Sequence, residues 1–161
     1  MRTGIGYDIH PLQAGRRLVL GGVDVPFDKG LEGWSDGDVL VHAIMDALLG
    51  GAALGDIGRY FPPGQEEFRG ISSLALLARV NSLLRREGWQ VINIDATIIA
   101  ERPVLRDYIE FMKRNIASEL EIDINLVSIK ASTNNGIGDI GAGTGIAALA
   151  VATINRRSVS A

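Results

Sequence analysis

The chain has 161 residues, of which 47% are apolar and 22% charged, and this composition suits one globular domain. Its net charge of −3 and its lack of a basic stripe interleaved with aromatics argue against a nucleic-acid partner. It has no cysteine, which excludes disulfides, iron–sulfur clusters and cysteine-type zinc sites. Any metal must therefore be held by histidine, carboxylate or backbone oxygen.

The chain carries no pattern typical of secretion or membrane insertion. The polar, glycine-bearing amino terminus lacks a signal-peptide core, and the longest apolar run, residues 145–154, is too short to span a bilayer. We expect a single domain over residues 1–161, a cytoplasmic location and no membrane partner.

The first third of the chain predicts a strand, a hairpin and a helix. Ile5, Tyr7 and Ile9 alternate with smaller or polar residues, as in a half-buried strand. Two short apolar runs flank Gly21 and predict a hairpin over residues 18–25, followed by a loop. Ser35 is a suitable N-cap for a helix over residues 36–49.

The helix predicted over residues 36–49 has its ends and its core face marked by residue type. Gly50 and Gly51 are expected to end it. The residues at helical spacing that should form its buried face are Leu40, Ile44, Ala47 and Leu48.

The remaining elements predict an α+β (α/β layered) fold. After a long loop over residues 55–70, the pattern gives a helix over 72–87, a strand over 91–100, a helix opened by Pro103, and strands over 126–133 and 146–154. We expect a mixed four- to five-stranded sheet with helices on one face, plus a small N-terminal hairpin.

Three residues form a candidate metal site. Asp8 and His10 lie two apart on the first strand and project from the same face, which Gly4 and Gly6 should leave open. His42, the only other histidine, lies on the first helix. Two histidines and a carboxylate suit catalytic zinc, which keeps a fourth position open, and equally suit a non-haem iron triad.

Asp38 and Asp46 flank His42 at four residues on either side, so they should share its helix face. They are candidates to orient the imidazoles from outside the ligand set. The alternatives are a solvated acidic helix face and histidines with no metal role.

A polar and glycine-rich segment is a candidate phosphate site. Residues 130–136 (Lys-Ala-Ser-Thr-Asn-Asn-Gly) end a strand and enter a loop whose amides and hydroxyls can cradle phosphate oxygens. The segment lacks the P-loop spacing, and residues 141–146 match a dinucleotide fingerprint only in part. A plain glycine loop between strands is the alternative.

Together these motifs resemble the 2-C-methyl-D-erythritol 2,4-cyclodiphosphate synthase family over essentially the whole chain. The matching blocks are residues 6–10 (Gly-Tyr-Asp-Ile-His), 35–43 (Ser-Asp-Gly-Asp-Val-Leu-Val-His-Ala), 46–50, 54–58 with Phe61-Pro62, and 130–133. The resemblance implies a phosphorus–oxygen lyase of non-mevalonate isoprenoid biosynthesis. Such an enzyme converts 4-diphosphocytidyl-2-C-methyl-D-erythritol 2-phosphate to the cyclic diphosphate and releases CMP.

The resemblance also implies a homotrimer with active sites between subunits. One Zn²⁺ per subunit would be bound by Asp8, His10 and His42, and Mg²⁺ or Mn²⁺ would bind with the substrate diphosphate. The partner is then a small molecule linked to cytidine diphosphate.

The resemblance assigns further roles residue by residue. Thr133 would polarise the α-phosphate, and Ser35 would contact phosphate. The other residues implied in substrate binding are Asp56, Ile57, Gly58, Ala100, Pro103, Val104, Leu105, Ser132, Asn134 and Asn135.

The chain departs from the family pattern at several positions. Trp34 stands where the family has a catalytic histidine, Pro63 replaces an aspartate, and Asn135 replaces a glutamate tied to the second cation. Asp139 and Ala142 replace an aromatic residue and an arginine associated with the trimer's central cavity. These changes leave two alternatives open: a divergent metal-dependent phosphohydrolase or lyase, and a non-catalytic trimeric binding protein.

Overall fold

The computed structural model describes residues 1–157, so the last four residues of the predicted domain lie outside the described part. The strands are β1 (Arg2–Ala14), β2 (Leu18–Leu20), β3 (Val23–Val25), β4 (Lys29–Leu31), β5 (Trp89–Ile99), β6 (Val127–Ser132) and β7 (Gly145–Arg156). The α-helices are α1 (Val39–Ala52), α2 (Ile57–Tyr60), α3 (Ser73–Arg86), α4 (Ile109–Leu120) and α5 (Gly138–Gly141).

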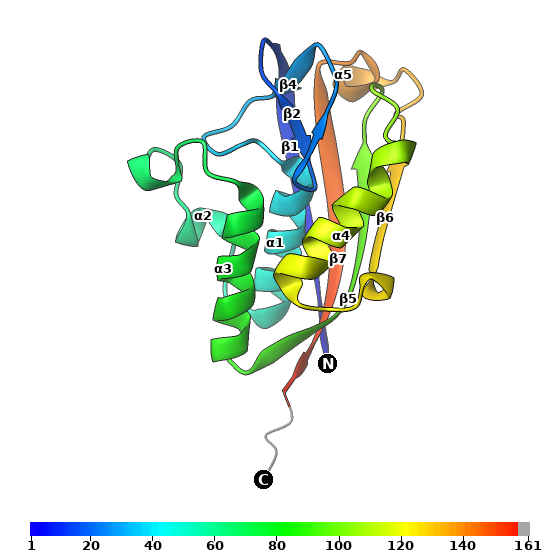
Figure 1. Cartoon of the computed structure of the whole chain (residues 1–161). Coiled ribbons are helices and arrows are strands. Elements are labelled where there is room, and N and C mark those ends of the chain that lie inside the picture. The colour runs from blue at the N-terminus through cyan, green and yellow to red at the C-terminus, as the bar shows by residue number, and fades with distance from the viewer. Residues whose placement is uncertain (158–161) are drawn as a thin grey trace.

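Five strands form one mixed sheet in the order β4-β1-β7-β5-β6 (Figure 1). β7 is antiparallel to both β1 and β5, whereas β6 is parallel to β5. β2 and β3 form a separate antiparallel hairpin. The predicted mixed sheet and the predicted hairpin are therefore confirmed.

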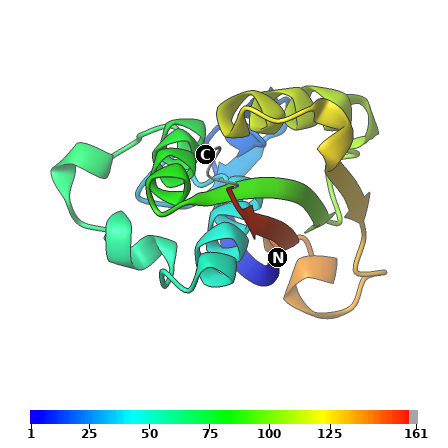
Figure 2. The same ribbon diagram turned by 90° about the horizontal axis from the view of Figure 1, so that it is seen from below.

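The three long helices α1, α3 and α4 lie on one side of this sheet, as the view along the strands shows (Figure 2). The strand side chains alternate accordingly. In β7, Ala148, Ala150 and Ala152 are buried against the helices, whereas Leu149 and Val151 remain partly exposed on the other face. The predicted one-sided helical layer is confirmed.

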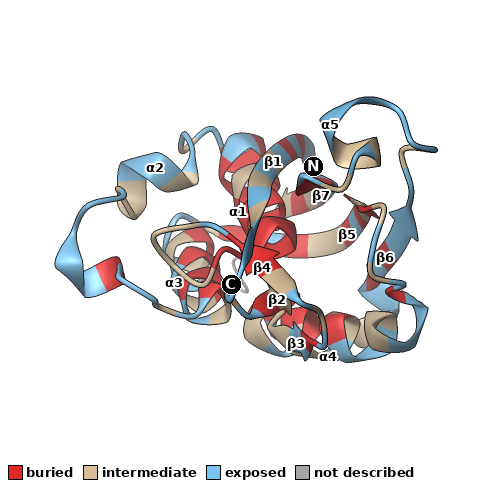
Figure 3. Cartoon of the chain, turned by 90° about the horizontal axis from the view of Figure 1, so that it is seen from above, coloured by how far each residue is buried: buried red, intermediate tan, exposed pale blue. Residues whose placement is uncertain are grey.

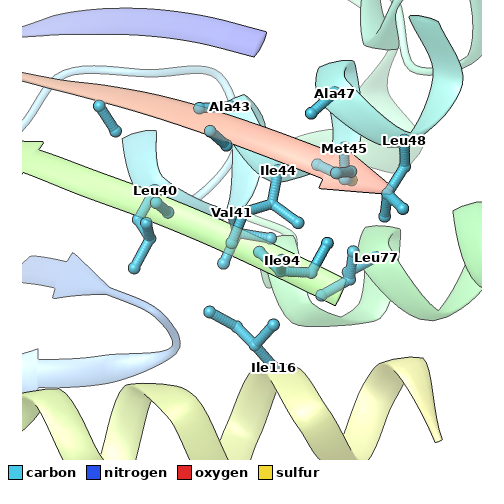
Figure 4. Packing of buried hydrophobic residues seen from close by; sticks show 14 of the residues in the cluster. Leu40, Val41, Ala43, Ile44, Met45, Ala47, Leu48, Leu77, Ile94 and Ile116 are labelled. Carbon is cyan, nitrogen blue, oxygen red and sulfur yellow. The ribbon is translucent and has the colours of Figure 1, made fainter. Parts of the chain in front are cut away.

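α1 is the centre of the core. Nearly all of its residues are buried (Figure 3), including the whole predicted face of Leu40, Ile44, Ala47 and Leu48. Figure 4 shows α1 side chains lying together with Ile94 of the sheet, Leu77 of α3 and Ile116 of α4 in one hydrophobic cluster. No helix in residues 1–157 combines the length and apolarity needed to cross a bilayer.

The glycines of β1 allow α1 to lie directly on the strand backbone. A Cβ at Gly4 would be 2.0 Å from the Ala47 carbonyl oxygen, and one at Gly6 would be 1.9 Å from that of Ala43. The predicted open face above Gly4 and Gly6 is therefore wrong, because α1 itself fills it. Gly51 faces β1 from within α1, with its own Cβ position 3.2 Å from the Gly4 nitrogen.

The predicted bounds of the first helix are also wrong at both ends. α1 begins after Asp38, whose carboxylate accepts a hydrogen bond from the Val41 amide at 3.2 Å, so Asp38 rather than Ser35 is the N-cap. Gly50 and Gly51 continue the helix, which ends where Ala53 adopts a left-handed conformation.

Three other expectations needed correction. The loop predicted after the hairpin contains β4, which pairs with the end of β1. The long loop predicted over residues 55–70 contains α2 and a 3₁₀ turn at Glu66–Phe68. The helix predicted from Pro103 begins only at Ile109, after a 3₁₀ turn.

We predict that Gly6→Ala destabilises the protein by about 3 kcal/mol, because its methyl group would overlap the α1 backbone. Thermal or urea unfolding measures the loss. Gly50→Ala is the matched control, since its Cβ meets nothing closer than the Ile5 carbonyl at 3.9 Å and it lies within a helix. The control should be neutral or stabilised by up to about 1 kcal/mol. Equal effects of the two substitutions would contradict the close-packing account.

Candidate metal centre and active site

Asp8, His10 and His42 converge at the junction of β1 and α1. Asp8 Oδ2 lies 2.8 Å from His10 Nε2 and 2.9 Å from His42 Nδ1, and the two ring nitrogens are 3.3 Å apart. A tetrahedral zinc ion with bonds of about 2.0–2.1 Å holds its donors about 3.3 Å apart. The three donor atoms therefore need only a small outward movement to receive an ion, and their types suit zinc or iron.

The hydrogen bonds of His10 determine which of its ring nitrogens faces the candidate metal site. Its Nδ1–H donates to the Glu32 backbone carbonyl, which can only accept, so Nε2 is the atom that faces Asp8 and His42. The hydrogen bond to Asp8 raises the pKa of His10, while burial acts in the opposite direction. Burial alone would raise the pKa of Asp8, but hydrogen bonds from both imidazoles hold it far below its usual range.

His42 presents Nδ1 to the donor cluster and Nε2 to two hydroxyls. Nε2 lies 3.0 Å from Ser73 Oγ and 3.2 Å from Ser35 Oγ. Ser73 is fully buried, and its hydroxyl donates to Asp36. Both imidazoles are thus held by partners outside the candidate ligand set.

A cavity of about 270 Å³ opens beside the three donors. Of the predicted site residues, Trp34, Ser35, Ile57 and Gly58 join the donors in its wall. The remaining wall is largely apolar and consists of Phe61, Pro63, Phe68 and Leu76. Asp56 is not among the residues that line this cavity; it is the N-cap of α2, with Oδ1 accepting the Arg59 amide at 3.1 Å.

A second cavity of about 430 Å³ lies at the far edge of the sheet. The structure brings six predicted site residues to it: Ala100, Pro103, Val104, Leu105, Ser132 and Thr133. They come from two neighbouring segments, the end of β5 with the following loop and the end of β6. Because β5 and β6 are parallel, their carboxyl ends meet at this edge of the sheet.

Asn134 and Asn135 do not line this second cavity. The Asn134 amide donates to Glu101 at 3.2 Å and its side chain donates to the Ile137 carbonyl. Asn135 accepts the Thr133 hydroxyl at 3.2 Å. In the isolated chain these side chains stabilise the loop that carries Thr133.

The comparisons with known proteins agree with this arrangement. The model of the YgbB family matches residues 1–155. The chain belongs to the YgbB family. A protein named 2-C-methyl-D-erythritol 2,4-cyclodiphosphate synthase from Dehalococcoides mccartyi is 54% identical to this family member over 157 residues, which is 98% of this chain and 100% of the relative.

Solved structures also resemble this YgbB-family chain. A structure described as a CDP complex of IspF from Plasmodium falciparum has a TM-score of 0.85 at 29% identity, covering 98% of this chain and 97% of that one. Bifunctional IspDF from Campylobacter jejuni has a TM-score of 0.93 at 38% identity, and 96% of this chain matches 42% of that longer one. The predicted family, fold class and enzyme activity are confirmed.

The roles predicted for Asp38 and Asp46 need correction. The Asp38 carboxylate accepts the Gly22 and Val41 amides, at 2.7 and 3.2 Å, and so joins the hairpin to the start of α1. Asp46 accepts the Ile57 amide at 2.8 Å and fixes the start of α2. The hydroxyls of Ser35 and Ser73 occupy the position beside His42 Nε2 instead.

The Trp34 side chain is hydrogen-bonded to the loop between α2 and the 3₁₀ turn. Its indole N–H donates to the Gln65 carbonyl at 2.8 Å, and the Arg69 guanidinium lies 4.5 Å from its ring. The only polar hydrogen of the Trp34 side chain is therefore already used in a hydrogen bond within the chain. Trp34 contributes an apolar wall where the family pattern has histidine.

Ser73 and Asp36 were not identified from the sequence. Ser73 lies 31 residues from His42 and reaches it only through the packing of α3 beside α1. The available signal was local: Ser73 opens a helix, and Asp36 lies within the motif beside Ser35. Neither position indicates an imidazole partner without the fold.

We predict that Asp8→Asn and His42→Ala each abolish stoichiometric zinc binding, because the first replaces the anionic donor with a neutral amide and the second leaves only two protein donors. Equilibrium dialysis with metal analysis of the folded variants measures this. Asp107→Asn, which changes an exposed carboxylate outside the cluster, should bind zinc like the wild type. Full binding by the two cluster variants would exclude this metal centre.

Asp38 predicts a distinctive pH dependence of stability. Complete burial, followed by the nearby Asp36 charge, raises its pKa from 3.8 to about 6. The folded state therefore holds this proton to higher pH than the unfolded state, and stability is lost as pH rises from about 4 to 6. Melting temperatures across this range should show that downward contribution in the wild type and not in Asp38→Asn. Parallel pH profiles would contradict it.

Proposed function

We propose that the chain catalyses the metal-dependent cyclisation of 4-diphosphocytidyl-2-C-methyl-D-erythritol 2-phosphate. An oxygen of the substrate's 2-phosphate forms a bond to the β-phosphorus, the bond from that phosphorus to the α-phosphate oxygen breaks, and CMP leaves. The product is 2-C-methyl-D-erythritol 2,4-cyclodiphosphate. Because nucleophile and leaving group belong to one molecule, the protein must chiefly position and neutralise phosphates.

The observation that carries this proposal is the convergence of Asp8, His10 and His42 beside a cavity, in a chain of this family. Zinc bound by these residues would supply Lewis-acid chemistry, withdrawing charge from a phosphate oxygen. The hydroxyl of Ser35 lies in the same wall and can donate to phosphate. Asp56 and the Ile57–Gly58 backbone are proposed to hold the erythritol hydroxyls.

The second cavity is proposed to hold the cytidine diphosphate. The segment from Ala100 to Leu105 would enclose the base, and Ser132 and Thr133 would face the phosphates. The Thr133 hydroxyl, which now donates to Asn135, would turn to the α-phosphate. Mg²⁺ or Mn²⁺ is proposed to bind with the diphosphate. Asn135, at the position where the family has glutamate, can offer this cation only an uncharged side-chain oxygen.

The separation of the two cavities supports an active site between subunits. Asp8, Ala148, Ile98 and Ala131 are successive partners across the sheet, so Asp8 and the β6 end of the second cavity lie three strands apart. Three strand spacings amount to about 14 Å. A metal held by Asp8, His10 and His42 would act on the β-phosphate, which belongs to the cytidine diphosphate itself. This separation supports an active site that combines the metal half of one subunit with the cytidine half of its neighbour.

The uncovered face of the sheet offers the corresponding contact surface. Ile5, Tyr7 and Ile9 of β1 project away from the helices, and Ile5 is 72% and Tyr7 52% exposed. Leu149 and Val151 of β7 pair with Tyr7 and Ile5 and extend this apolar stripe. We propose that three copies bury the stripe around a common axis, as a cytoplasmic homotrimer.

The activity is tested by incubating the substrate with purified protein, zinc and magnesium and recording phosphorus NMR spectra over time. The wild type should give the cyclic diphosphate and CMP in equal amounts, and His42→Ala should give neither. Removing metal with a chelator should abolish turnover, and adding zinc back should restore it. Release of inorganic phosphate would favour a phosphohydrolase instead. Metal and CDP binding without turnover would favour a non-catalytic binding protein.

Mixed oligomers test the shared active site. His42→Ala removes one half of the site, and Thr133→Trp fills the other, so each variant alone should be inactive. When the two are co-expressed, random trimers should regain about a quarter of wild-type activity, because that fraction of sites combines two intact halves. Native mass spectrometry would confirm that mixed trimers form. Mixed trimers without activity would contradict a site shared between subunits.

A further inference from the structure

We propose that Ser73, held by Asp36, is a positioning residue that fixes the ring of His42 so that Nδ1 faces the metal. The proposal rests on the metal site described under the proposed function and extends it to two residues outside the ligand set. Asp36, Ser73 and His42 form a continuous chain of hydrogen-bonding groups that ends at the Nε2 atom.

The direction of each hydrogen bond in this chain follows from the groups involved. An ionised carboxylate can only accept, so the Ser73 hydroxyl must donate its single proton to Asp36 Oδ1. The Ser73 oxygen then retains only lone pairs toward His42 Nε2, 3.0 Å away. Nε2 therefore carries a ring proton that it keeps, and Nδ1, whose hydrogen bond to Asp8 is the one that a metal would replace, is the nitrogen that supplies the lone pair.

Asp36 is itself tightly fixed. Its Oδ2 accepts the Ser73 backbone amide at 2.8 Å, and its Oδ1 accepts the Asp38 amide at 3.2 Å. The first contact joins Asp36 to the start of α3, and the second joins it to the N-cap of α1. The orientation of His42 thus depends on the relative placement of both helices.

The second hydroxyl beside Nε2 has a different position. Ser35 Oγ is slightly farther away, at 3.2 Å, and it lines the cavity, whereas Ser73 has no exposed surface. The His42 Nε2–H proton has one principal acceptor, and this is Ser73 Oγ, because that contact is the shorter one and the Ser73 side chain is held by Asp36. The Ser35 hydroxyl is thereby left free to turn toward a phosphate.

The test measures zinc affinity of Ser73→Ala by competition with a chromogenic chelator. We expect a 10- to 100-fold loss, as found when partners of metal-bound histidines are removed. Ser72→Ala is the matched control, because the adjacent serine is exposed and its side chain makes no capping hydrogen bond. The control should stay within about twofold of the wild type, as an exposed hydroxyl outside the chain of bonds should.

A spectroscopic readout separates positioning from a general loss of stability. The chain has only two histidines, so ¹⁵N-histidine labelling of the zinc-loaded protein gives few ring signals. The wild type should show a slowly exchanging proton on His42 Nε2 and one on His10 Nδ1. Ser73→Ala should lose the first signal and keep the second, because His10 relies on Glu32.

The outcomes separate the two proposals. A folded Ser73→Ala that keeps wild-type affinity and the Nε2 signal would overturn the positioning role while leaving the metal site intact. A wild-type protein that binds no zinc would overturn both. If Ser73→Ala does not fold, Asp36→Asn removes the charged acceptor and leaves Ser73 in place. That variant should lose about tenfold in affinity, and wild-type affinity would overturn the proposal.

Discussion

The close contact between the β1 backbone and α1 is the constraint on which the rest of the structure depends. Gly4 and Gly6 provide it, because any side chain there would overlap the carbonyl oxygens of Ala47 and Ala43. The same contact brings His42, one residue before Ala43, close to Asp8 and His10, which follow Gly6 on the same face of β1. Packing and metal-site geometry therefore have a common cause, and a change that lifts α1 from the sheet would separate the donors.

The sequence predicted the elements that carry strong periodicity and the candidate metal-binding residues that sit on them. Alternation along β1 places Asp8 and His10 on one face, and the apolar spacing of α1 identifies its buried side correctly. The family motifs then linked these local features to one activity, which the comparisons confirm.

What the sequence could not predict depends on contacts between distant segments. The sequence predicted that Asp38 orients His42, four residues away, but the Asp38 carboxylate caps α1 and accepts the Gly22 amide of the hairpin. Gly50 and Gly51 resemble a helix stop, yet they continue α1 where it passes close to β1. Ser73 meets His42 only because α3 packs beside α1. In each case a tertiary contact overrides the local propensity.

The two halves of the candidate active site lie on opposite sides of β7 in the sheet, and we propose that oligomerisation joins them. A crystal structure with zinc and CDP, using anomalous scattering at the zinc edge, is the most direct measurement. The account predicts zinc bonded to Asp8 Oδ2, His10 Nε2 and His42 Nδ1 of one subunit, beside a CDP held by Thr133 of its neighbour. Zinc bound away from these three atoms, or zinc and CDP held by the same subunit, would contradict it.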